Sequence, residues 1–222
     1  MKILVKIWWS LIAPKNWKWL DLNYLKSISS VINNIDEKFF IIHWTWNIWH
    51  WRVKNLEEKS NWISRNDLIK KNYLNWKKII KNFFNQVNEY FKKFSRLKIE
   101  YFLQNQKFYE NWLIWWDILK DWTIISSDDI FQFVLENDNT DLSLILTDVD
   151  WILDENKKVL TNIYNTKNIK FWNKKNDVTW AMKSKVEKII ITWKKVVICN
   201  WYDTKNIMNW IKYWVWKWTL IW

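Results

Sequence analysis

The sequence contains no glycine in 222 residues, although it contains 24 tryptophans. A globular chain of this length ordinarily carries about 7% glycine, or roughly 16 residues. Turns that require a positive φ angle are difficult to build without glycine, because a bulky side chain is strained there. The chain must therefore avoid such turns or place another residue where glycine is expected.

Tryptophan occupies the positions where glycine is expected, because it follows strand-like segments and precedes helical ones. Examples are KIWWS (6–10), HWTWNIWH (43–50), DVDWIL (148–153) and CNWYD (199–203). We therefore interpret Trp in this sequence as standing for Gly, the result expected when UGA codons that encode glycine are translated as tryptophan. Some bacterial lineages reassign UGA in this way, and a deliberate substitution is the alternative explanation.

The net charge of +12 arises from 35 Lys and Arg against 23 Asp and Glu. A basic chain rich in genuine tryptophan can stack on single-stranded nucleic acid or lie in a membrane interface. The tryptophans here do not line one face of a helix, and the lysines are scattered, as AT-rich coding also produces. We therefore expect neither nucleic acid nor membrane as a partner, although the charge suits a polyanion such as a nucleotide.

The single cysteine, Cys199, excludes an internal disulfide and fits a reducing compartment. The segment 1–14 resembles a signal peptide only superficially, because Lys6 interrupts its apolar run. No segment reaches the roughly 20 apolar residues of a membrane span. These features predict a cytoplasmic protein.

Short apolar runs alternate with helical patterns, which is typical of parallel strands joined by crossover helices. The predicted strands are 2–7, 38–43, 113–125 with a hairpin at Asp121–Trp122, 141–148, 194–200 and 218–222. The predicted helices are 20–35, one or two within 63–94, 126–137, 178–190 and 204–211. Residues 97–111 give no clear pattern. No linker or repeat divides the chain, so we predict one α/β domain over residues 1–222.

Two of the tryptophan-rich segments, KIWWS and HWTWNIWH, begin where a predicted strand ends. Glycine at such a point allows backbone N–H groups to approach phosphate oxygens, and a helix N-terminus just beyond favours negative charge. Two loops of this kind suggest that phosphate groups are held from both sides.

The ordered set KIWWS, HWTWNIWH, TDVDWIL and DVTWAMKSK, with glycine at the Trp positions, resembles the amino-acid kinase family and, within it, the isopentenyl phosphate kinases. The resemblance covers residues 1 to about 50 and about 113 to 222. It implies an open αβα sandwich with a mainly parallel central sheet. About residues 1–125 would bind the phosphoryl acceptor and about 126–222 would bind ATP. Between these stretches the chain is shorter than the family pattern, in the region that builds the pocket for the organic tail of the acceptor.

The resemblance implies four catalytic residues. Lys6 matches the lysine that bridges the acceptor and the γ-phosphate, and Lys15 matches a second phosphate lysine. His50 matches the histidine that bonds the acceptor phosphate in isopentenyl phosphate kinases and is absent from most other members. Asp128 matches the aspartate that orients the active-site lysines, with Asp129 an adjacent candidate. Without such roles, these residues would be solvated surface lysines, a histidine at a helix start and an N-cap carboxylate.

The resemblance also implies the binding residues, which lie at strand ends and helix starts. Those for ATP are Trp8, Trp9, Thr147, Asp148, Asp150 and Lys185. Those for the acceptor are Trp44, Trp46, His50, Trp116 and Asp117. Mg²⁺ is expected to arrive with ATP, held mainly by phosphate oxygens and water, so no protein ligand is assigned to it.

An acceptor phosphate is already an anionic nucleophile, so the protein must position two polyanions and neutralise charge without a general base. We therefore predict ATP-dependent phosphorylation of isopentenyl phosphate to the diphosphate, by a monomer or a homodimer. A kinase of the same fold that acts on a phosphonate such as fosfomycin is the nearest competing function, and His50 disfavours carboxylate acceptors. Two non-catalytic functions also stay open at this point: a degenerate kinase fold that senses a ligand, and a Trp-rich basic binding protein.

Overall fold

The computed structural model describes part of the chain, with only the backbone at 95–98, 112–115 and 179–182. The described residues are 1–8, 11, 20–43, 78, 81–82, 85–91, 94–98, 112–115, 127–147, 152–167, 169–171, 179–202, 207, 211 and 219–222. No helix among these residues has both the length and the apolar character needed to span a bilayer.

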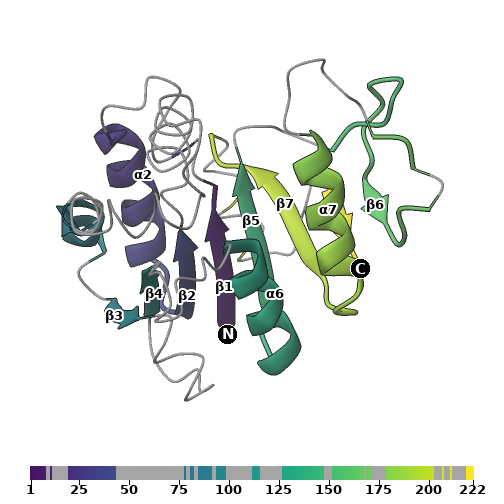
Figure 1. The fold of residues 1–222 in the computed structure, drawn as a ribbon. Helices are drawn as coiled ribbons and strands as arrows, with labels where there is room; N and C mark the ends of the chain where they lie inside the picture. Colours follow the sequence, from purple (N-terminus) through teal and green to yellow (C-terminus); the bar gives the residue numbers. More distant parts are fainter. Residues whose placement is uncertain are drawn as a thin grey trace, which may run out of the picture.

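Within the described residues, eight strands form one sheet in the order β3-β4-β2-β1-β5-β7-β8-β6 (Figure 1). The strands are β1 (Lys2–Ile7), β2 (Lys38–His43), β3 (Ser95–Lys98), β4 (Trp112–Trp115), β5 (Leu142–Thr147), β6 (Asn162–Ile163), β7 (Val196–Asn200) and β8 (Thr219–Ile221). The helices with stated bounds are α2 (Leu22–Asn33), α6 (Ser127–Asn137) and α7 (Thr179–Ile190).

The described sheet is mainly parallel, since β7 and β8 form its one antiparallel pair of strands. Strands β1 to β4 lie on one side and β5 to β8 on the other, so β1 and β5 meet at the centre. Open α/β sheets bind ligands outside the carboxyl ends of the strands where the strand order reverses. The carboxyl ends of β1 and β5 therefore mark the expected binding region.

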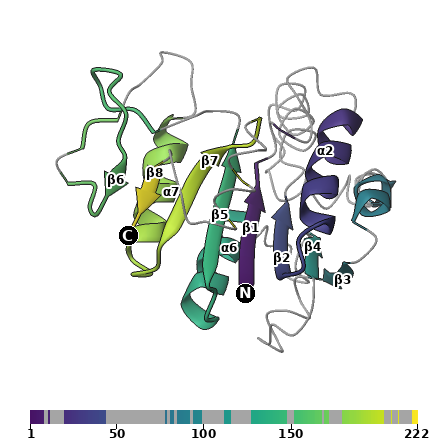
Figure 2. The ribbon, with the colours of Figure 1, turned by 180° about the vertical axis from the view of Figure 1, so that it is seen from behind.

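The side chains of β1 face two separate cores. Ile3, Val5 and Ile7 belong to the hydrophobic cluster that includes residues of α2, whereas Leu4 belongs to the cluster that includes α6 and α7. Figure 1 shows α6 and α7 in front of the sheet, and Figure 2 shows them behind it. Because successive side chains of a strand point to opposite faces, Lys6 lies on the same face as Leu4. The strand thus directs its one central lysine toward α6 and α7.

Helix α6 runs antiparallel to β1 and is attached to it at both ends. Lys6 Nζ forms an ion pair with Asp128 at the start of the helix, and Lys2 Nζ lies 3.1 Å from Asp138 Oδ1 just beyond its end. Lys2 and Lys6 are four residues apart, which is about 13 Å along a strand. Asp128 and Asp138 are ten residues apart, which is about 15 Å along a helix, so the two spacings match closely. The two lysines of β1 therefore lie opposite the acidic residues at the two ends of α6.

The predicted fold, an open sandwich of helices on a mainly parallel sheet, is confirmed. The helix predicted over 20–35 is shorter, because the Asp21 carboxylate accepts a hydrogen bond from Tyr24 N and caps α2. Strands β3 and β6 were not predicted. The sequence of β3, SRLK, has no apolar run, and β6 has only two residues.

Other predicted segments are described only in part. Within 63–94, residues 85–90 are helical, as are 78 and 81–82. Within 204–211, residues 207 and 211 are helical. The predicted hairpin at Asp121–Trp122 lies outside the described residues.

Two of the described tryptophans bear differently on the glycine interpretation. Trp193, three residues beyond α7, has a φ of 55° and is 89% exposed, which is the conformation and setting in which glycine commonly ends a helix. Trp201 is 2% exposed, and its ring packs edge-on against Tyr24 with the centroids 5.3 Å apart. The backbone thus favours glycine at Trp193, whereas Trp201 fills the core as a tryptophan does.

Candidate active site

Lys6 and Asp128 form the centre of a charged cluster at the carboxyl end of β1. The Lys6 side chain is 5% exposed and the Asp128 side chain 23%, and Lys6 Nζ donates to Asp128 Oδ1. Asp128 lies in the first turn of α6, where the helix dipole also favours a carboxylate. A lysine this deeply buried requires a partner of opposite charge. The structure therefore brings together two residues that the sequence predicted as catalytic.

The ionisation of this pair is set by burial and by nearby lysines. Burial lowers the pKa of Lys6 from its ordinary value, although Asp128 opposes the shift. Burial alone would raise the pKa of Asp128, but Lys6 foremost, together with Lys185 and Lys188, holds that pKa below its ordinary value. Asp128 is accordingly a carboxylate surrounded by lysines from β1 and α7.

Lys185 lies in the second turn of α7, one turn beyond the helix start at which the sequence placed it. Its side chain faces Trp8, the residue that follows β1. Its Nζ lies 3.5 Å from the centroid of the Trp8 ring, a cation–π contact. Burial lowers the pKa of Lys185 to about 8, and the positive charges of Lys6 and Lys188 contribute, whereas Asp128 opposes the shift. The Trp8 indole thus covers an ammonium group that the sequence assigns to ATP.

We expect the Lys185 side chain to lose its proton near pH 8 in the chain that carries Trp8. Because its pKa is lowered on folding, the unfolded chain binds more protons above this pH, and the contribution of Lys185 to folding stability rises from about pH 8 to 10.5. Trp8→Gly removes the covering ring and is expected to raise this pKa. NMR titration of the Lys185 side chain measures both values. A titration midpoint of Lys185 at the ordinary lysine value of 10.5 in the chain that carries Trp8 would contradict the prediction.

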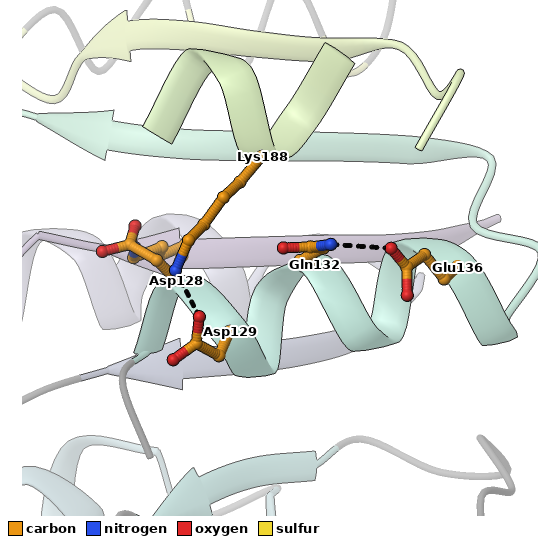
Figure 3. A network of polar contacts seen from close by, with 6 residues as sticks. Asp128, Asp129, Gln132, Glu136 and Lys188 are labelled. Atoms are coloured by element: carbon orange, nitrogen blue, oxygen red, sulfur yellow. Dashed lines mark hydrogen bonds and ion pairs between the residues drawn. The ribbon is translucent and has the colours of Figure 1, made fainter. Parts of the chain in front are cut away.

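A second ion pair adjoins the first. Lys188 Nζ, from α7, pairs with Asp129 Oδ1, the residue next to Asp128 (Figure 3). The sequence suggested Asp129 as an adjacent candidate but missed Lys188. The available signal was the spacing of three residues from Lys185, which places both lysines on one face of a helix.

Thr147 and Trp8 lie at the reversal of strand order. Thr147 ends β5 and is 1% exposed, and its carbonyl oxygen accepts a hydrogen bond from Trp201 N at 3.0 Å. Trp8 N donates to the Leu146 carbonyl oxygen at 3.0 Å, so the backbone beyond β1 stays attached to β5. The two strand ends that the sequence assigned to nucleotide binding are therefore neighbours.

His43 ends β2 and lies beside Ile7 in the register of the sheet. It is 3% exposed, and burial lowers its pKa to about 4, so it is neutral at physiological pH. Its position suits the structural role that the sequence suggested.

The remaining predicted site residues lie outside the described part of the chain. They are Lys15, His50, Trp9, Trp44, Trp46, Trp116, Asp117, Asp148 and Asp150.

The described cluster suits anionic phosphate groups better than a bare metal ion. Three lysines, Lys6, Lys185 and Lys188, face the two aspartates at the start of α6. No group of three or more His, Cys, Asp or Glu is placed to hold a metal within the residues that the structure describes. The charge of the described cluster therefore suits phosphate groups.

Comparison with known proteins shows similarity in fold. No family model matches the sequence, and no curated protein matches it. A structure of isopentenyl phosphate kinase is similar with a TM-score of 0.70 and 15% identity over 100% of both chains. The T. acidophilum isopentenyl phosphate kinase product complex gives 0.66 and 16%, also over 100% of both chains. UMP kinase from Ureaplasma parvum gives 0.64 and 11% over 100% of this chain and 99% of that one. The chain therefore has the fold of the amino-acid kinases, and the solved structures that it resembles are phosphotransferases.

Proposed function

We propose that the protein, with glycine at its Trp positions, transfers the γ-phosphoryl group of ATP to isopentenyl phosphate. The observation that carries the proposal is the cluster of Lys6, Asp128 and Lys185 at the point where the strand order reverses. This is the place where an α/β sheet binds ligands, and its charge suits two phosphate groups that approach each other. The amino-acid kinase fold supports the same reaction class.

The residues of the chain act in this proposal by position and charge. An oxygen of the acceptor phosphate attacks the γ-phosphorus, the bond to the β,γ-bridging oxygen breaks, and ADP leaves. Lys6 neutralises charge on the transferred group, and Asp128 holds the Lys6 ammonium in place. Lys185 contacts the ATP phosphates once glycine replaces the Trp8 ring. Mg²⁺ bound with ATP supplies further neutralisation of phosphate charge.

The proposal assigns the two sides of the sheet to the two substrates. The part of the chain up to about residue 125, with β1 to β4, binds the acceptor, and the part from about 126, with β5 to β8, binds ATP. Lys6, at the end of β1, lies beside β5 and can therefore reach both.

The identity of the acceptor rests on His50, which the sequence matches to the histidine of isopentenyl phosphate kinases. His50→Ala is expected to lower kcat/KM for isopentenyl phosphate by roughly ten- to a hundred-fold, because a lost hydrogen bond to a charged group costs about 1.5–3 kcal/mol. The affinity for ATP should remain nearly unchanged, and His50→Gln should recover part of the loss because an amide still donates. Steady-state kinetics and nucleotide titration measure these effects.

The control is an acceptor panel of isopentenyl phosphate, dimethylallyl phosphate, fosfomycin and glutamate. Preference for fosfomycin would replace the isoprenoid acceptor by a phosphonate, and preference for glutamate would remove the role of His50. An unaltered kcat/KM for isopentenyl phosphate in His50→Ala would also contradict the proposed acceptor.

A further inference from the structure

The hydroxyl of Thr219 joins β8 to a segment that lies far away in the sequence. Thr219 is the first residue of β8 and is fully buried. Its Oγ1 accepts a hydrogen bond from Ile152 N at 3.2 Å and donates one to the Leu160 carbonyl oxygen at 2.7 Å. One buried side chain thus pairs with two backbone groups, which lie 67 and 59 positions earlier in the chain.

The two backbone groups are the ends of a hairpin, residues 152–160. Leu160 N donates a hydrogen bond to the Ile152 carbonyl oxygen at 2.8 Å, and an antiparallel bridge follows inside the hairpin. At the tip, Asp154 Oδ1 accepts hydrogen bonds from two backbone N–H groups of the turn, at 2.9 and 2.8 Å. The hairpin is therefore a compact unit, and the Thr219 hydroxyl attaches its base to the sheet.

The hairpin follows directly on the residues that the sequence assigns to the nucleotide. Asp148 and Asp150 lie between Thr147, the last residue of β5, and Ile152. The carbonyl oxygen of Thr147 accepts a hydrogen bond at 3.0 Å from the backbone of the residue after β7, so this stretch is attached to the sheet where it begins. The Thr219 hydroxyl attaches the residue at which it ends.

The hydroxyl lies on the face of the sheet that carries α7. Ile221, two residues further along β8, belongs to the hydrophobic cluster that includes residues of α6 and α7, and Ile152 belongs to the same cluster. Side chains two residues apart on a strand point to the same face. Thr219 therefore holds the hairpin on the face covered by the helix that carries Lys185.

Thr192 makes the same pair of hydrogen bonds in a different setting. Its Oγ1 donates to the Ile189 carbonyl oxygen at 2.7 Å and accepts from Lys194 N at 3.3 Å. These partners lie three and two positions away, so the Thr192 hydroxyl closes a local turn beyond the end of α7. The Thr219 hydroxyl instead sets the position of one segment of the chain relative to another.

We propose that Thr219 is a positioning residue for ATP: its hydroxyl holds the base of the hairpin 152–160 and so fixes the end of the stretch that carries Asp148 and Asp150. This inference rests on the proposed function, since it concerns the nucleotide of the same site. Thr219 acts through Ile152 and does not itself contact the substrate.

The kinetic test uses the chain with glycine at the Trp positions. Thr219→Val keeps the shape of the side chain but leaves Ile152 N and the Leu160 carbonyl oxygen without this partner. It is expected to raise both KM and the dissociation constant for ATP by about five- to ten-fold with a smaller change in kcat, because ground-state contact with the nucleotide is weakened. Steady-state kinetics and isothermal titration measure these values.

Three variants separate the hydroxyl from packing and from general stability. Thr219→Ser keeps the hydroxyl and should restore KM. Thr219→Cys, whose thiol bonds only weakly, should give an intermediate KM and serves as the test if Thr219→Val does not fold. The matched control is Thr192→Val, which should lower the free energy of unfolding in chemical denaturation yet leave KM unchanged. An equal rise of KM in Thr192→Val, or no recovery in Thr219→Ser, would overturn the inference.

Hydrogen exchange separates this inference from the proposed function. In Thr219→Val the Ile152 amide loses its acceptor and should exchange faster than in the parent chain, whereas in Thr192→Val it should not. Faster exchange with an unchanged ATP affinity would overturn the inference, because the hydroxyl would then hold the hairpin without serving the nucleotide. If the parent chain binds ATP but transfers no phosphoryl group to any acceptor, the proposed function fails while the ATP affinities of the variants still decide the inference. A parent chain that binds no ATP would overturn both.

Discussion

Replacing Lys6 by methionine is expected to reduce kcat by at least about 100-fold, because the cation that neutralises the transferred group is lost. Methionine keeps much of the side-chain volume in a position that is 5% exposed. The same change leaves the Asp128 carboxylate without its main partner, and breaking a buried ion pair typically costs about 3–5 kcal/mol. Loss of activity in this variant alone could therefore reflect unfolding.

A double variant separates the two effects of removing Lys6. Lys6→Met with Asp128→Asn is neutral at both positions, so chemical denaturation should show most of the stability restored while turnover remains lost. Lys2→Met is the matched control, since Lys2 lies on the same strand and pairs with Asp138 at the other end of α6. A double variant as active as Lys2→Met would show that Lys6 has no special role in phosphoryl transfer.

The second large effect concerns Trp8. The chain as written is expected to bind ATP poorly or not at all, because the Trp8 ring occupies the space over the Lys185 ammonium. Replacing every Trp by Gly should improve the dissociation constant for ATP by about 100-fold or more, equivalent to about 2.7 kcal/mol. Isothermal titration of both chains measures this difference.

Two further chains locate the effect. In one, Trp8 alone is kept while the other tryptophans become glycine, and ATP binding should again be weak. In the other, Trp193 alone is kept, and binding should be retained because that ring is 89% exposed and lies beyond the end of α7. Equal ATP affinity in all chains would count against the glycine interpretation. The coding DNA gives an independent check, since UGG at most of these positions would exclude it.

The central strands could be predicted because each is a short apolar run buried on both faces of a parallel sheet, as in KILVKI and LSLILT. Strand β3 could not, because four residues with two basic side chains carry no such signal. The family resemblance implied an open sandwich with a mainly parallel sheet but gave no order of the strands, which comes from the structure. Local pattern cannot specify which of several buried runs become neighbours.

The candidate site was predictable to a different degree for each residue. Lys6 and Asp128 are separated by 122 positions, and only the family pattern could suggest that they meet. The structure adds the local reason, since alternation along β1 turns Lys6 toward the helix that carries Asp128. Lys188 was missed because an exposed lysine on an amphipathic helix ordinarily indicates solvent. The ion pair of Lys188 could not be predicted from the local sequence, because its partner Asp129 lies 59 residues earlier in the chain.

The attachment of α6 to β1 at both ends has a consequence for motion. With Lys6 and Asp128 at one end and Lys2 and Asp138 at the other, the strand and the helix are expected to move as one rigid body. Helix α7 contacts α6 through the exposed pair of Lys188 and Asp129, and both helices also contribute buried residues to one hydrophobic cluster. Lys6 and Asp128 are therefore expected to keep their relative position during the proposed reaction.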